Sequence, residues 1–148
     1  MRKVLVPLSI FLAAAAAVYG VWASERIPDA PQPIAWDREA CAHCHMHVGD
    51  PAFAAQAIAA DGRVYDFDDP GCLLAWRARR AARGESAPVR VWFHKLDEDR
   101  WLPIDAVGFL PVPQSPMGSG LGAVERGRPG ALGLDEATRR ALAVEPSP

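Results

Sequence analysis

The chain has 148 residues, about one domain's worth, and carries 16 Lys and Arg against 18 Asp and Glu, a formal net charge of −2. Without Arg2 and Lys3, which precede an apolar run, the charge falls to −4. This acidic balance excludes the basic patches that nucleic acid requires of its partners. Three cysteines are an odd number, so a framework made only of disulfides would leave one thiol unpaired.

The first 23 residues have the composition of an export segment. Two basic residues are followed by an apolar run from Val4 to Ala23, which ends in small residues before Ser24. The run is also about as long as a membrane-spanning helix. We therefore predict a signal peptide or an N-terminal membrane anchor over 1–23, with the folded part exported to the periplasm. The Pro-rich segment over 24–40 is predicted to be an extended tether.

Two hairpins are predicted in the folded part. The first joins apolar runs over 53–60 and 63–67 around Asp61-Gly62, a pair typical of two-residue hairpin turns. The second joins a branched and aromatic run over 89–96 to a return strand over 101–104. The return strand contains a proline, which cannot donate to a ladder, so we expect it at an edge of the sheet.

One main helix is predicted between the two hairpins. Asp69 is typical of a helix N-cap and Pro70 of the first helical position. Gly84 is a natural C-terminal stop. Cys72 and Trp76 lie four residues apart and therefore share a face of this helix. Cysteine on an apolar face is more often a small buried hydrophobe than a ligand, and we interpret Cys72 in that way.

The remaining segments have weaker patterns. We predict a short strand over 109–112, a glycine-rich loop over 118–133 and a short terminal helix over 134–144. The order of the main elements is β-β-α-β-β, which predicts a small α+β domain with antiparallel hairpins and one main helix.

The chemistry-bearing residues gather in the segment Cys41-Ala42-His43-Cys44-His45-Met46-His47, which holds two thiols, one thioether and three imidazoles. A second thioether, Met117, lies far downstream in a loop. Soft sulfur ligands select Cu(I) and other thiolate-binding metals, whereas imidazole suits copper, zinc and haem iron. We therefore predict a metal or haem site. No serine–histidine–acid set, phosphate loop or catalytic carboxylate pair is evident, so we do not expect an enzyme.

Several interpretations of this cluster are open. Cys41-x-x-Cys44-His45 matches the attachment pattern of c-type haem, with His45 as one axial ligand and Met117 as the other, so a monohaem c-type cytochrome is the main alternative. The same pair could exchange disulfides or form one structural disulfide. A copper carrier would use Cys44, Met46 and Met117, because thiolate and thioether ligands together favour Cu(I).

Four sequence elements carry a resemblance to a known family. They are Cys41-x-x-Cys44-x-Met46-x-Val48, Tyr65-Asp66-Phe67-Asp68-Asp69, Trp101-x-x-x-Asp105-Ala106 and Pro116-Met117-Gly118. In this order they resemble NosL-type proteins, the accessory copper chaperones of nitrous oxide reductase and their relatives, over roughly 41–124. The resemblance implies a small α+β protein of ββαβ-type modules, with a copper-binding domain over 41–126 and a loop and short helix over 127–148.

The resemblance also implies a function and a ligand set. It implies that Cys44, Met46 and Met117 bind Cu(I), with Cys41 as a helper. The partner would be a periplasmic copper enzyme, with nitrous oxide reductase as one candidate, or its maturation machinery. The membrane would be a partner only through an uncleaved N-terminal segment. This chain departs from the family at His45, which stands where glycine is usual, and lacks the lipidation cysteine of many relatives.

Overall fold

The computed structural model describes Ala14 and residues 27–144. The predicted signal peptide or anchor over 1–23 therefore lies outside the described residues, apart from Ala14. Among the helices of the described part, none is both long and apolar enough to span a bilayer.

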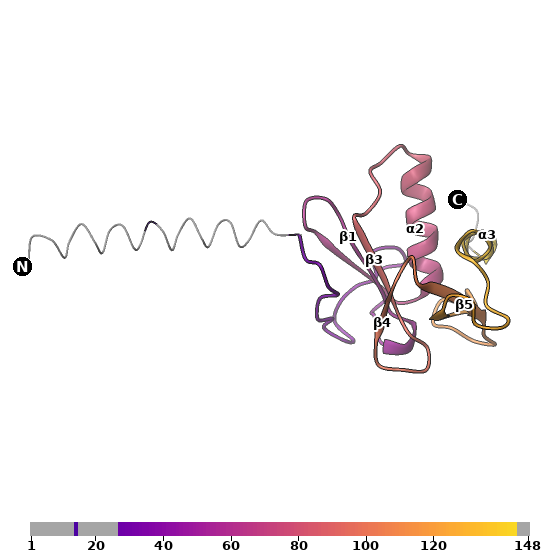
Figure 1. Ribbon diagram of the computed structural model, residues 1–148. Coiled ribbons are helices and arrows are strands. Elements are labelled where there is room, and N and C mark those ends of the chain that lie inside the picture. The colour runs from indigo at the N-terminus through magenta and orange to yellow at the C-terminus, as the bar shows by residue number, and fades with distance from the viewer. Residues whose placement is uncertain (1–13, 15–26, 145–148) are drawn as a thin grey trace, which may run out of the picture.

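A four-stranded antiparallel sheet forms one layer of the domain (Figure 1). Its strands are β1 (Ala55–Ile58), β2 (Val64–Phe67), β3 (Arg90–His94) and β4 (Trp101–Pro103), in the order β2-β1-β3-β4. A 3-10 turn, η1 (Pro51–Phe53), leads into β1. The strand β4 lies at an edge, as its proline predicted.

The turn between β1 and β2 differs from the predicted two-residue type. The amide of Ala59 donates to the carbonyl of Arg63 at 2.9 Å, and the amide of Gly62 donates to the carbonyl of Ala59 at 3.0 Å. The loop therefore has three residues, and Gly62 closes it at φ +81°. Glycine takes up this left-handed conformation without a steric penalty, which is why a three-residue loop ending in glycine is also a common hairpin connection.

The main helix, α2 (Pro70–Ala82), begins and ends as predicted. Asp69 caps it by accepting the amide of Gly71 at 2.7 Å, and Pro70 occupies the first position. At the other end Gly84 has φ +70° and donates to the carbonyl of Ala81 at 3.0 Å. The residues from Pro70 to Trp76 are buried, so the first two turns of α2 face the core.

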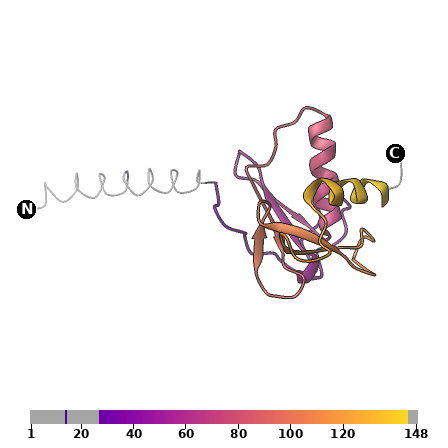
Figure 2. The ribbon, with the colours of Figure 1, turned by 45° about the vertical axis from the view of Figure 1, so that its right-hand side comes forward.

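A two-stranded sheet and a second helix complete the domain. Strands β5 (Val107–Pro111) and β6 (Leu121–Glu125) pair antiparallel, and α3 (Leu134–Val144) spans the predicted range. Figure 2 shows α3 crossing α2, against which it packs. The predicted loop over 118–133 is wrong at β6, because Leu121–Glu125 pair with β5 and pack closely against neighbouring residues. A Cβ added to Gly122 would lie 2.7 Å from Leu96 Cδ2. The fold is a small α+β domain, as predicted.

The core lies between the four-stranded sheet, α2 and the small sheet. Phe93 on β3 meets Phe109 on β5 edge to face, with ring centroids 5.0 Å apart. Phe67 on β2 meets Trp76 on α2 in the same way at 5.2 Å. Cys41 and Cys72 belong to this core. The cysteine segment is thus part of the packed interior and is not an appendage of it.

The predicted tether reaches the sheet within the described residues. The amide of Gln32 donates to Gln56 Oε1 at 2.6 Å, and Gln56 Nε2 donates back to the carbonyl of Gln32 at 3.2 Å. Gln56 is a fully buried residue of β1 and also donates to Asp66 Oδ1 at 2.7 Å. These bonds satisfy a buried amide and attach residue 32 to the domain.

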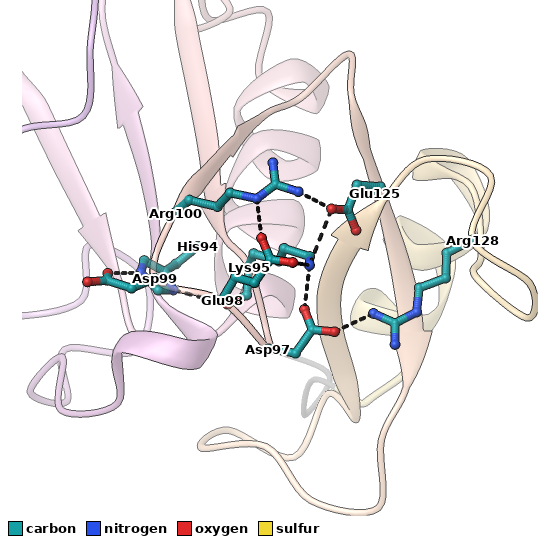
Figure 3. A network of polar contacts seen from close by, with 8 residues as sticks. All are labelled: His94, Lys95, Asp97, Glu98, Asp99, Arg100, Glu125 and Arg128. Carbon is teal, nitrogen blue, oxygen red and sulfur yellow. Dashed lines mark hydrogen bonds and ion pairs between the residues drawn. The ribbon is translucent and has the colours of Figure 1, made fainter.

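A network of ion pairs joins the two sheets (Figure 3). Lys95 follows β3, is only 4% exposed, and pairs with Asp97 at 2.8 Å, with Glu125 of β6 at 3.2 Å and with Glu98. Hydrogen bonds from Lys95 and Arg128 lower the pKa of Asp97 to about 2. The network therefore fixes the β3–β4 turn against β6.

Candidate metal centre

The loop that carries the first two cysteines is closed by backbone hydrogen bonds. Cys41 donates its amide to the carbonyl of Met46 at 2.8 Å, and His45 donates to the carbonyl of Cys41 at 3.0 Å. An isolated bridge between Ala40 and His47 closes the base of the loop. His45 has φ 63°, a left-handed conformation that favours glycine. The backbone at residue 45 would therefore suit glycine better than histidine.

Three thiols meet behind this loop. The Sγ atoms of Cys41, Cys44 and Cys72 all lie within 4.8 Å of one another, and all three are free thiols. Cys41 and Cys72 are buried, and Cys44 is half-buried. The loop supplies Cys41 and Cys44, whereas Cys72 is the third residue of α2. Sequence reasoning missed Cys72 as a candidate ligand, because nothing in its local pattern separates it from a core cysteine.

The ionisation of each of the three thiols affects the pKa of the other two. The Cys72 thiol donates a hydrogen bond to the Cys41 sulfur, which lowers the pKa of Cys41 and raises that of Cys72. Burial raises the pKa of Cys44. The first proton to leave this cluster is therefore that of Cys41, and the resulting thiolate disfavours ionisation of its neighbours.

A cavity of about 250 Å³ gives access to the cluster from one side. Cys44 and Cys72 line it together with Met117, whereas the fully buried Cys41 does not. The remaining lining residues are His43, Gly71, Ser119, Ala141 and Val144. Met117 is 39% exposed, and the loop that carries it brings a thioether to the same cavity as two of the thiols.

Of the predicted ligands, the structure thus brings Cys41 and Cys44 together and places Met117 at the same cavity. Met46 is 58% exposed and does not line the cavity. Among the histidines, His43 lines the cavity, and His45 is exposed. His47 Nδ1 lies 2.6 Å from the backbone carbonyl oxygen of Asp37.

The cluster has the composition and size of a metal site. Thiolates bound to one metal ion at about 2.3 Å lie roughly 4 Å from one another, a spacing compatible with three sulfurs that all lie within 4.8 Å. An all-sulfur donor set suits soft and borderline cations such as Cu(I) and Zn(II). No protein-family model matches the chain, and neither the curated proteins nor the solved structures contain a significant match. The residues themselves therefore support a metal-binding role for this thiol cluster.

Proposed function

We propose that this chain is an exported Cu(I)-binding metallochaperone of NosL type, which delivers copper to a periplasmic copper enzyme or to its maturation machinery. Nitrous oxide reductase is the client that the resemblance suggests. The observation that carries the proposal is the meeting of three thiols within 4.8 Å, beside a cavity that Met117 also lines. Thiolate and thioether ligands favour Cu(I), and a cavity on one side leaves a path for transfer.

Zinc is the principal rival cation, since Cys₃His is a common structural zinc set and His43 lines the cavity. Structural zinc sites are closed by four ligands of the protein. Here the cavity is lined by two of the thiols and by the thioether of Met117. A thioether is a ligand that zinc sites seldom use and that Cu(I) accepts. The donor set and its one-sided access therefore support copper.

Haem is less well supported than copper. Pockets that enclose drug-sized ligands have volumes of ~300–1,000 Å³, and the cavity beside the thiols has only about 250 Å³. Cys41, which a c-type haem would bond covalently, is fully buried and accepts a hydrogen bond from Cys72. These two observations favour a small cation over a porphyrin.

The test is a competition experiment on the reduced, exported protein under anaerobic conditions. Binding of one Cu(I) against a Cu(I) chelator is expected, alongside a zinc titration of the same sample that gives weaker binding. The loaded protein should be colourless, and X-ray absorption at the copper edge should show sulfur neighbours. Tighter binding of zinc would favour a structural zinc site, and a Soret band in the purified protein would favour the cytochrome.

The two cysteines of the loop should contribute unequally. Cys44 lines the cavity and also belongs to the cluster, so Cys44→Ser is expected to abolish Cu(I) binding, whereas Cys41→Ser only weakens it. Oxidation that joins the two sulfurs should block loading, because a disulfide offers no thiolate. Equal and negligible effects of both substitutions in the chelator competition would contradict this assignment of the site.

A further inference from the structure

One buried carboxylate connects two chain segments that both line the cavity, the start of α2 and the loop of Met117. Asp69 is fully buried and accepts four hydrogen bonds. Its Oδ1 accepts the Gly71 amide at 2.7 Å and the Ser119 hydroxyl. Its Oδ2 accepts the Ser115 hydroxyl at 2.6 Å and the Met117 amide at 3.0 Å. Oδ1 thus caps α2 and also holds Ser119, whereas Oδ2 holds the part of the loop from Ser115 to Met117.

Other hydrogen bonds hold the two ends of this loop, among them one from the Val112 amide to the carbonyl of Gly120 at 2.9 Å. Its internal bonds run from the Gly118 amide to the Ser115 carbonyl and from the Gly120 amide to the Ser115 hydroxyl, each at 3.0 Å. Besides the carboxylate, Arg140 Nε donates to the carbonyl of Ser119 at 3.2 Å. The amide of Met117 itself donates to Asp69 Oδ2. The position of this methionine therefore depends on Oδ2 of Asp69.

The loop also lies directly against the start of α2. A Cβ added to Gly71 would lie 2.4 Å from the Cβ of Ser119, closer than side chains tolerate. Glycine at this position lets the loop approach the helix turn that carries Cys72. The contact and the four hydrogen bonds together fix the distance between the segment of Met117 and the segment of Cys72.

We propose that Asp69 is a positioning residue for the metal site, which holds Met117 over the cavity in register with Cys72. The inference rests on the proposed function, because it gives the Met117 thioether a role toward the bound Cu(I). When the bonds to Oδ2 are lost, the loop moves away from α2 and the thioether leaves the cavity. Groups that orient metal ligands through hydrogen bonds typically contribute 10–100-fold to metal affinity.

The test uses Asp69→Asn, which separates the two tasks of the carboxylate. Asparagine is as good an N-cap as aspartate, so its single oxygen can still accept the Gly71 amide. Its NH₂ group donates and cannot accept from Ser115 or from the Met117 amide. We expect Cu(I) affinity to fall about 10–100-fold. Asp61→Asn is the matched control, since Asp61 Oδ1 accepts the Arg63 amide at 3.0 Å in the β1–β2 turn and the same exchange there should leave affinity unchanged.

A double-mutant cycle with Met117→Ala decides whether Asp69 acts through the thioether. The effect of Asp69→Asn on Cu(I) affinity should vanish once Met117 is alanine. An equal fold-change in both backgrounds would overturn the proposal, because Asp69 would then act on the fold in general. Gly71→Ala provides a second variant that displaces the loop sterically and keeps Asp69. It should weaken Cu(I) binding in the same way, and unchanged affinity would count against the proposal.

Amide hydrogen exchange of the copper-free protein separates this proposal from the proposed function. Asp69→Asn should speed exchange at Met117 while the amides in the middle of α2 stay protected as in the unsubstituted protein. If the unsubstituted protein fails to bind Cu(I), the proposed function is overturned, and the exchange data still show whether Asp69 holds the loop. Unchanged exchange at Met117 would overturn the positioning role, whatever the metal.

Discussion

Replacement of Cys72 by alanine distinguishes a ligand from a core residue. Cys72 is 4% exposed, so Cys72→Ala removes one buried sulfur atom. As a packing change this resembles the loss of one methyl group and should lower the free energy of unfolding of the apo protein by about 0.5–1.5 kcal/mol. If the sulfur also binds the metal, Cu(I) affinity should fall by more than the 10–100-fold typical of residues around a site. A fall of at least about 100-fold corresponds to about 2.8 kcal/mol.

The assay pairs urea unfolding of the apo protein with competition against a Cu(I) chelator. Ile58→Val is the control, because it removes one methyl from a fully buried residue of β1 and should cost the same about 0.5–1.5 kcal/mol of stability. Its Cu(I) affinity should equal that of the unsubstituted protein. If Cys72→Ala loses stability like Ile58→Val and binds Cu(I) equally well, Cys72 is a core residue and the site has two thiols.

Three further predictions follow from particular residues. Met117→Ala should weaken Cu(I) binding with little change in the thermal stability of the apo protein, because a 39% exposed side chain carries little packing energy. Truncation of a core methionine would instead lower the free energy of unfolding by roughly 2–5 kcal/mol. Ready unfolding together with normal copper binding would show that Met117 is a core residue. His45→Gly should relieve ~1–2 kcal/mol of strain from the left-handed backbone, offset in part by ~0.4–1 kcal/mol of added chain entropy in the unfolded state. Urea unfolding should therefore show a higher free energy of unfolding, with Cu(I) binding unchanged. A lower free energy of unfolding would contradict the strain. Asp97→Asn should lower the free energy of unfolding near neutral pH. This loss should shrink as pH falls from about 4 toward 2, because Lys95 and Arg128 depress the folded-state pKa of Asp97 below its unfolded value. Urea unfolding at several pH values checks this, and a loss of stability that is constant with pH would refute it.

The predictable parts of the fold are those that local chemistry decides. Asp69, Pro70 and Gly84 have conformational requirements of their own, and α2 begins and ends where they indicate. The strand β6 could not be found in this way. Its residues, Leu121–Glu125, include a glycine and small side chains, and they form a strand because β5 pairs with them and Leu96 packs onto Gly122. Tertiary contacts, which no window of sequence contains, decide this segment.

The residues of the candidate site likewise fall into those that local sequence could indicate and one that only tertiary packing reveals. Cys41 and Cys44 stand three residues apart among other potential ligands, so the segment suggested a metal or haem site while a disulfide stayed open. Met117 was placed near the metal by its chemistry and by the resemblance to NosL-type proteins, and its loop does line the cavity. Cys72 looked like a core residue because burial and ligation give the same local pattern on a helix. Only the packing of α2 behind the loop brings its sulfur within 4.8 Å of the other two.

Among the residues that carry these sulfurs, Cys41, Cys44 and Met117 are increasingly exposed in that order, and this order bears on the proposed transfer. Cys41 is fully buried, Cys44 is half-buried, and Met117 is 39% exposed. Thiolates bind Cu(I) with a negative charge, whereas a neutral thioether releases it more readily. A client that approaches the cavity would therefore meet the weakest ligand first and could replace it while the thiolates still hold the ion. A structural zinc site, by contrast, is closed by four ligands of the protein and needs no ligand that a client can replace.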